Sequence, residues 1–150
     1  MYVDPRGLRF GAVVTTIVLA LGLLTQSVWV LAFQTAVFAL GAIVGLQAAP
    51  YGLVFKKVIR PRLAPPAELE ASAPPRFAQG VGLAFGVVAT LGFATGLTTL
   101  GVIATAMALA AAFLNATFSF CLGCEMFLII RRVTGGSTER LIPASTAARS

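Results

Sequence analysis

Hydrophobic residues dominate two long stretches of the chain, and charged residues are confined to the segments around them. No Asp, Glu, Lys or Arg occurs from Phe10 to Phe55 (46 residues) or from Phe77 to Cys124 (48 residues). A membrane-spanning helix needs about 20 apolar residues to cross roughly 30 Å of hydrocarbon. One helix over either stretch would be about 70 Å long, so each stretch predicts two crossings.

Polar and glycine-containing interruptions mark the turn within each stretch. Thr25-Gln26-Ser27 interrupts the first stretch, and Gly96 to Thr99 interrupts the second. We therefore expect an all-α integral membrane protein, a four-helix transmembrane bundle built as two hairpins within a domain of residues 1–132. The predicted spans are residues 10–25, 28–47, 77–95 and 100–120.

The basic residues predict the orientation of the spans. All eleven Lys and Arg lie before the first span, between the second and third, or after the fourth, and the two opposite turns have none. The positive-inside rule then makes both termini cytoplasmic. A basic cluster after the second span is expected to attract anionic lipids or to dock an acidic partner. The cluster consists of Lys56, Lys57, Arg60 and Arg62.

The segments outside the predicted spans are read as connectors. The cytoplasmic linker, residues 56–76, contains Pro61 to Pro75, which holds five of the eight prolines. That composition favours an extended, polyproline-like linker. The tail, residues 133–150, is polar and is expected to be disordered. A faint repeat is present as well, because Arg9-Phe10 opens the first hairpin and Arg76-Phe77 opens the second, 67 residues later.

Composition excludes several classes of protein. The chain is 58% hydrophobic and 11% charged, whereas soluble domains are about 45–50% apolar and roughly a quarter charged. A soluble enzyme, a disordered chain and a nucleic-acid binder are therefore excluded, despite the net charge of +6. The absence of histidine removes haem ligation through His, ordinary zinc catalysis and an imidazole base.

Small residues at a spacing of four indicate where helices pack. Membrane helices associate through close approach of small residues, and positions i and i+4 share a face. The pattern serves either the bundle or a homo-oligomer. The predicted packing residues are Gly41, Gly45, Gly82, Gly86, Gly92, Gly96, Ala104, Ala108, Ala112 and Ala116.

One segment carries candidate chemistry. Cys121 and Cys124 form a Cys-x-x-Cys pair with Glu125 beside them. Such a pair cycles between dithiol and disulfide, and Gly123 permits the backbone adjustment that a bond between the sulfurs requires. A fresh helix starting near Cys121, after a break at residues 118–120, would favour a thiolate there. Glu125 opposes the thiolate and could accept a proton if partly buried.

Alternatives to thiol chemistry stay open. The cysteines could be inert small hydrophobes in a helix interface. A metal is less favoured, because two thiolates without histidine leave a tetrahedral ion short of ligands unless two chains share it. The preferred depth is the cytoplasmic interface, with residues 126–130 as an interfacial helix. A span counted back from Arg131 would instead bury the pair in the inner leaflet. The interfacial depth is preferred because an unbroken helix over residues 100–130 would be too long for one span. In both placements the pair faces a reducing cytosol, so a stable structural disulfide is not expected.

Several blocks of sequence resemble a bacterial membrane family, domain of unknown function 4395. They are VDPRG-x-RFGA, QTAVFALGA, PYGLVF, RPRLAPPAELE, PPRFAQGVGL and AAFLNATFSFCLGCE, and the resemblance covers roughly residues 3–132. The family has no assigned activity. The resemblance implies a context only: relatives are often encoded near thioredoxin-like proteins and thiosulfate sulfurtransferases, which favours chemistry at Cys121 and Cys124.

These observations lead to a functional hypothesis with two alternatives. The preferred one is a membrane-embedded thiol or sulfur relay that receives electrons or a sulfane sulfur from a soluble thioredoxin-like or sulfurtransferase protein. It would pass them to a lipid-soluble acceptor such as a quinone. The second is a non-catalytic subunit that anchors or assembles a larger membrane complex. The third, a permease for sulfur oxyanions, lacks a cation within any predicted span.

Overall fold

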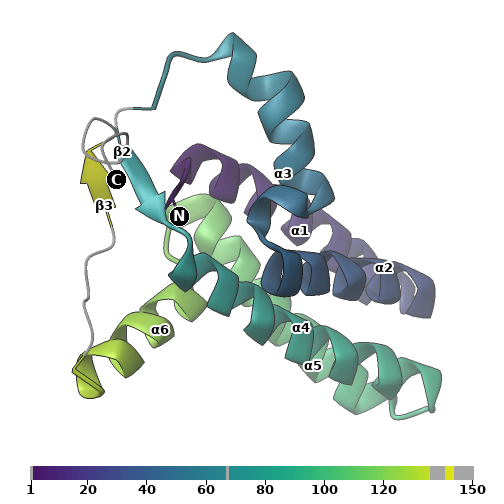
Figure 1. Cartoon of the computed structure of the whole chain (residues 1–150). Helices are drawn as coiled ribbons and strands as arrows, with labels where there is room; N and C mark the ends of the chain where they lie inside the picture. Colours follow the sequence, from purple (N-terminus) through teal and green to yellow (C-terminus); the bar gives the residue numbers. More distant parts are fainter. Residues whose placement is uncertain (1, 67, 136–140, 144–150) are drawn as a thin grey trace.

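The computed structural model describes residues 2–66, 68–135 and 141–143, and the chain is mainly helical (Figure 1). Its first hairpin consists of α1 (Pro5–Thr25) and α2 (Val28–Ala39), which a π-helix extends over Leu40–Val44. The second consists of α4 (Ala73–Ala94) and α5 (Thr98–Phe118). By length and composition α1, α4 and α5 could each cross a membrane, whereas Val28–Val44 is a shorter apolar helix.

Local signals set the helix boundaries in the first hairpin. The Asp4 carboxylate accepts a hydrogen bond from the Arg6 backbone N–H at 2.9 Å and caps the start of α1. Gln26 has a φ of 50°, which ends α1, and the Ser27 hydroxyl accepts from the Val30 N–H to start α2. The predicted turn at residues 25–27 is therefore confirmed. Gly96, with a φ of 86°, likewise lies in the predicted turn of the second hairpin.

The bundle core lies where the two hairpins meet. α1 packs along α5 and α2 packs along α4, in addition to the contacts within each hairpin. Most outward-facing side chains of the bundle are apolar, Trp29 (83% exposed) among them. A soluble protein rarely leaves so much contiguous apolar surface uncovered. The buried core cluster comprises Leu19, Leu31, Phe38, Ala89, Ala104 and Ala108.

Most of the predicted small residues lie at helix contacts. A Cβ on Gly82 would lie 2.7 Å from the Phe38 ring, and one on Gly92 would lie 2.8 Å from the Gly101 nitrogen. Replacing these glycines would therefore push neighbouring helices apart. The same holds for Gly86 and Gly41, whose added Cβ atoms would meet Thr35 and Gln79. In α5, Ala104, Ala108 and Ala116 are buried and Ala112 packs partly buried against the core.

Two of the predicted packing glycines have a different role. Gly45 and Gly96 have φ values of 140° and 86°, and a Cβ on either would meet no atom within 4 Å. They are not packing residues but positions where the backbone adopts a conformation that other residues rarely reach. Gly45 also corrects the second predicted span: the helical segment ends at Val44, short of residue 47, because the backbone turns away at Gly45.

The prediction of an extended linker is wrong at the two ends of the linker, which are helical. A short 3₁₀ turn (Leu46–Ala48) leads into α3 (Pro50–Val54), and helical turns continue through Phe55–Ile59 and Arg60–Arg62. Pro61, Pro74 and Pro75 misled the prediction, because each lies in the first turn of a helical segment, where its missing N–H is not needed.

A small antiparallel sheet joins three distant parts of the chain. β1 (Tyr2–Val3) pairs with β2 (Glu68–Ala71), and β2 pairs with β3 (Leu141–Pro143). The linker thus contains a central strand rather than a polyproline segment. β3 also corrects the prediction of a disordered tail at those three residues, since its backbone groups pair with β2. Residues 136–140 and 144–150 lie outside the described part.

Matched arginine contacts connect the two hairpins. The Arg9 guanidinium, near the start of α1, donates to the carbonyl oxygens of Ala116 and Thr117 at 2.9 and 3.3 Å. Arg76, near the start of α4, donates to the carbonyl oxygens of Ala42 and Ile43 at 3.0 and 2.9 Å. Each hairpin's opening arginine therefore caps the last turn of the other hairpin's second helix, where carbonyl groups lack intrahelical partners. The faint repeat in the sequence has this structural counterpart.

Candidate functional site

The cysteine pair lies at a break between two helices. α5 ends at Phe118, and Ser119 adopts a left-handed conformation with a φ of 55°. A new helix, α6 (Leu122–Val133), then starts with Cys121 as its N-cap. The predicted break at residues 118–120 and the fresh helix after it are both confirmed, and the unbroken alternative is wrong because the backbone leaves the helical conformation at Ser119.

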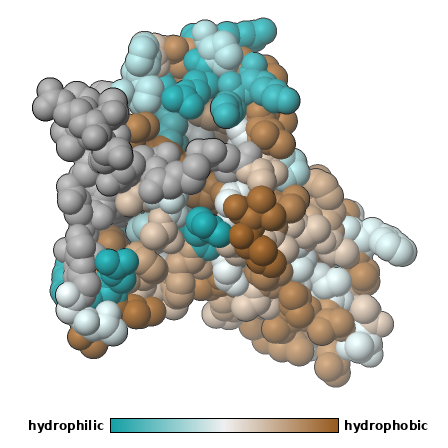
Figure 2. All heavy atoms as spheres, viewed as in Figure 1, coloured by the Kyte–Doolittle hydropathy of each residue, from teal (hydrophilic) through white to brown (hydrophobic). Residues whose placement is uncertain are grey.

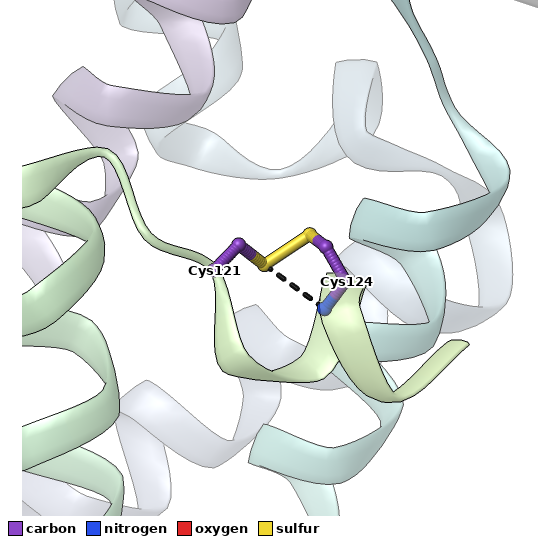
Figure 3. The surroundings of a disulfide bond; sticks show 2 residues. All are labelled: Cys121 and Cys124. Atoms are coloured by element: carbon purple, nitrogen blue, oxygen red, sulfur yellow. Dashed lines mark hydrogen bonds between the residues drawn. A yellow bond between two sulfur atoms is a disulfide. The ribbon is translucent and has the colours of Figure 1, made fainter. Parts of the chain in front are cut away.

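The two sulfurs are joined by a disulfide bond, with the Cα atoms 5.1 Å apart (Figure 3). The Cys124 backbone N–H also donates to the Cys121 sulfur at 3.2 Å. Cys124 is 2% exposed, whereas Cys121 is partly exposed. The structure therefore contains the pair as a disulfide, which differs from the expectation of a reduced pair, and it leaves Cys121 more exposed than Cys124.

Gly123 is required for a reason other than the one predicted. A Cβ on Gly123 would lie 2.6 Å from the Cα and Cβ atoms of Ala78 in α4. Its lack of a side chain lets the first turn of α6 press directly against the start of α4. The ring of Phe127, one turn further along α6, lies 5.7 Å from the ring of Phe77. This packing buries Cys124 and fixes the orientation of the pair.

Glu125 lies in the first turn of α6 and is partly buried. Its backbone N–H donates to the Cys121 carbonyl at 3.0 Å. A carboxylate in the first turn interacts favourably with the partial positive charge at a helix N-terminus. Glu125 is thus placed beside the pair as predicted, with a role in helix initiation as well.

Exposed apolar side chains flank Cys121 along the chain. Phe118, Phe120 and Leu122, which flank Cys121 along the chain, are all exposed. Arg9 and Ala78 also build the site, and sequence reasoning missed both. Arg9 holds the last turn of α5, and Ala78 receives α6. A basic residue directly before a long uncharged stretch was the available signal for Arg9, whereas nothing in the sequence distinguishes Ala78.

The predicted basic cluster is not part of this site. Lys56, Lys57, Arg60 and Arg62 are exposed on the helical turns that follow α3. These turns and α6 leave the bundle in different directions (Figure 1). Among the described residues, no group of three or more His, Cys, Asp or Glu side chains could hold a metal ion.

A buried amide is a second feature that sequence reasoning missed. Gln34 in α2 is 1% exposed, and its Oε1 accepts a hydrogen bond from the Tyr51 hydroxyl at 2.7 Å. Its Nε2 has no hydrogen-bond partner among the described residues. Burial raises the pKa of Tyr51 to about 12, so the hydroxyl stays a donor. The contact fastens α3 to the bundle.

A groove between α4 and α5 offers no reactive group. Its volume is about 320 Å³, and its lining is entirely apolar. It therefore provides hydrophobic contact only. The lining residues are Ala84, Phe85, Val88, Leu100, Ile103, Ala104 and Met107.

The fold and the site define a class of protein: a helical chain with three helices able to cross a membrane and a cysteine pair at the start of a short amphipathic helix. The chain belongs to the family described as Domain of unknown function (DUF4395), whose sequence model matches residues 3–132. The predicted family membership is thereby confirmed. Neither a curated protein nor a solved structure matches the chain.

Proposed function

We propose that the chain is a thiol or sulfur relay of the bacterial inner membrane, with Cys121 as the attacking thiol and Cys124 as the resolving thiol. The unequal exposure of the two cysteine residues carries this proposal. An external reagent reaches Cys121, whereas the buried Cys124 is placed to react only with its neighbour. Exchange through a mixed disulfide needs this division of roles.

The start of α6 supports a reactive Cys121. Its sulfur accepts the Cys124 N–H, and the N-terminus of a helix carries a partial positive charge. Both features favour the thiolate, which is the nucleophilic form of cysteine. Glu125 is a candidate acceptor for the proton released when the thiolate forms.

Reduction of the pair follows ordinary exchange chemistry. A thiolate of a soluble thioredoxin-like dithiol attacks the Cys121 sulfur, the bond to Cys124 breaks, and Cys124 leaves as a thiolate. The partner's second thiol then displaces Cys121, so the partner becomes a disulfide and the pair takes up two electrons and two protons. A lipid-soluble quinone returns the pair to the disulfide and becomes the hydroquinone. A sulfurtransferase would instead load Cys121 as a persulfide, and attack by Cys124 would release sulfide.

We further propose four spans with both termini cytoplasmic. β1, β2 and β3 come from the N-terminus, the linker and the tail, and they share one sheet. Segments in one sheet lie on one side of a membrane, so each hairpin crosses an even number of times. Val28–Val44 is then the second span. Its 12 α-helical and five π-helical residues cover about 25 Å, which is shorter than the roughly 30 Å of bilayer hydrocarbon. A locally thinner bilayer accommodates this difference in length.

A second function, assembly or anchoring of a larger membrane complex, is favoured by one observation. Lys56, Lys57, Arg60 and Arg62 form an exposed basic surface that is separate from the disulfide. An acidic partner would dock there without any thiol chemistry. The two functions differ in whether the cysteines are needed.

The test uses the fact that the chain has only two cysteines. In mildly oxidised native membranes the Cys124→Ser variant should trap a mixed disulfide with its soluble partner, because Cys121 attacks the partner's disulfide and no Cys124 thiol is present to complete the exchange. The matched Cys121→Ser variant should trap none, since Cys124 is buried. Mass-tag alkylation and identification of the trapped protein are the readouts. Thiols that label only after denaturation, with a double Ser variant that keeps the cellular phenotype, would refute the relay and favour anchoring.

The topology has its own test. A periplasm-dependent reporter fused after Ser150 should be inactive, and the same reporter inserted in the turn at residues 96–97 should be active. Activity after Ser150 would contradict the cytoplasmic placement of the C-terminus.

A further inference from the structure

Two short helical segments leave the same end of the bundle. The first, here called arm 1, comprises residues 50–62, that is α3 and the helical turns after it. The second, arm 2, is α6. In Figure 1 arm 1 runs toward the top of the view and arm 2 toward the lower left, away from the long axis of the bundle.

The arms are attached in the same way. Each follows the second helix of a hairpin after a residue with positive φ, Gly45 before arm 1 and Ser119 before arm 2. Each also packs an aromatic ring against the start of its own hairpin's first helix. The Phe55 and Phe10 ring centroids are 6.0 Å apart, and the Phe127 and Phe77 centroids are 5.7 Å apart. The arms are therefore built into the fold rather than trailing from it.

Each arm leaves apolar side chains uncovered. In arm 2 the residues that face α4 are Gly123, Cys124 and Phe127, and large apolar side chains elsewhere on the helix are exposed. Arm 1 likewise buries Phe55 and exposes three apolar side chains. The exposed apolar residues are Leu53, Val54 and Val58 in arm 1, and Leu122, Met126, Ile129, Ile130 and Val133 in arm 2.

Each arm also carries basic residues toward its C-terminal end. Arm 1 has four of them and no acidic residue, and arm 2 ends in Arg131 and Arg132 with Glu125 in its first turn. The Arg131 guanidinium lies 5.5 Å from the centre of the Phe127 ring. In Figure 2 hydrophilic residues gather where the two arms end, whereas the long helices are mainly hydrophobic.

We propose that both arms lie in the headgroup region of an anionic phospholipid leaflet, with their exposed apolar side chains in the acyl boundary and their basic side chains at the phosphates. Amphipathic helices with basic polar faces bind membrane surfaces in this way. The occupant is a lipid surface because the arms begin where the membrane-spanning helices end, and because their charge is opposite to that of the lipid. Each basic residue near such a surface contributes about 1 kcal/mol.

The arrangement has a consequence for the cysteine pair. Cys121 is the N-cap of arm 2. A leaflet that holds arm 2 therefore also holds the partly exposed Cys121 at the boundary between headgroups and hydrocarbon. The inference rests on the membrane placement in the proposed function, but not on its thiol chemistry.

The test places single probes on the protein in bilayer discs. In a Cys121→Ser, Cys124→Ser background, Ile129→Cys (arm 2) and Val58→Cys (arm 1) are labelled with a fluorophore, and Ala64→Cys in the exposed linker serves as the matched control. The discs contain phosphatidylcholine alone or with phosphatidylglycerol. Two quenchers are compared, one attached to lipid acyl chains and one, iodide, in the aqueous phase.

We expect the lipid-borne quencher to act several-fold more strongly on both arm probes than on the Ala64 probe, and iodide to show the reverse order. The difference in lipid-borne quenching between the arm probes and the Ala64 probe should be larger in discs that contain phosphatidylglycerol than in discs of phosphatidylcholine alone. Replacing Arg131 and Arg132 with Gln should remove this effect of phosphatidylglycerol for the Ile129 probe, and it should leave the effect unchanged for the Val58 probe.

Three results would overturn the inference. If iodide quenches the arm probes as strongly as the Ala64 probe, the arms lie in water. If the arm probes become protected only when a partner protein is added, the arms are a protein-docking surface. Quenching independent of phosphatidylglycerol would remove the role of anionic headgroups. A protein that does not enter the discs would refute the membrane placement itself, and the outcome of the thiol trapping is independent of all of these.

Discussion

The contact between Gly123 and Ala78 gives a sharp test of how the cysteine pair is held. In the Gly123→Ala variant the new Cβ would lie 2.6 Å from two carbon atoms of Ala78. Carbon atoms in ordinary contact are about 3.5–4.0 Å apart, so α6 must move away from α4 by about 1 Å. Overpacking of this kind costs about 1–3 kcal/mol.

Gly80→Ala is the matched control. Gly80 lies in the same helix as Ala78, and an added Cβ there meets no atom within 4 Å. A Tm shift of about 2–4 °C per kcal/mol is typical of chains of this size. We therefore expect Gly123→Ala to melt about 2–12 °C below the parent protein in detergent, and Gly80→Ala to melt at or above the parent.

A second readout reports on the site itself. In a Cys121→Ser background Cys124 is the only thiol, and its 2% exposure predicts slow alkylation in the folded protein. Gly123→Ala should speed that alkylation, because displaced packing uncovers the sulfur, whereas Gly80→Ala should not. Equal melting of the two variants together with continued protection of Cys124 would show that the α6–α4 contact does not bury the pair.

Three further predictions concern the rest of the fold, each read from thermal melting in detergent. Burial alone would raise the pKa of Asp4, but the hydrogen bonds that it accepts from Arg6 lower the pKa below 3.8. The stability that this carboxylate contributes is therefore present above pH 3.8 and is lost as the pH falls through the folded-state pKa. Asp4→Asn should remove this dependence of stability on pH. Ala108→Leu, at a buried position of α5, should destabilise by about 1–3 kcal/mol, whereas Leu at the exposed Ala110 should not. Tyr51→Phe should lower the free energy of unfolding by about 1–3 kcal/mol, because it leaves the buried amide oxygen of Gln34 unpaired. In a Gln34→Leu background the same substitution should cost little, and an equal cost there would contradict this explanation.

Local sequence patterns were sufficient to predict the class of fold and the place of the candidate site. Two uncharged stretches predicted paired apolar helices because a bilayer excludes charge, and the turns at residues 25–27 and 96–99 follow from polar and glycine residues that act locally. The break before Cys121 was predictable as well, since one helix from residue 100 to residue 130 is too long for a single span. These features depend on composition and neighbouring residues alone.

Other features depend on contacts between residues far apart in the chain, and these could not be predicted from local patterns. The middle of the linker forms a strand because distant backbone groups pair with Glu68–Ala71. Its ends are helical, and the prolines there hid that outcome because the first turn of a helix tolerates proline. The unequal access of Cys121 and Cys124 depends on Ala78, more than 40 positions earlier, which no local pattern distinguishes from other alanines. Packing between distant segments therefore assigns the two cysteines their different environments, whereas the sequence pattern shows only that they are near each other.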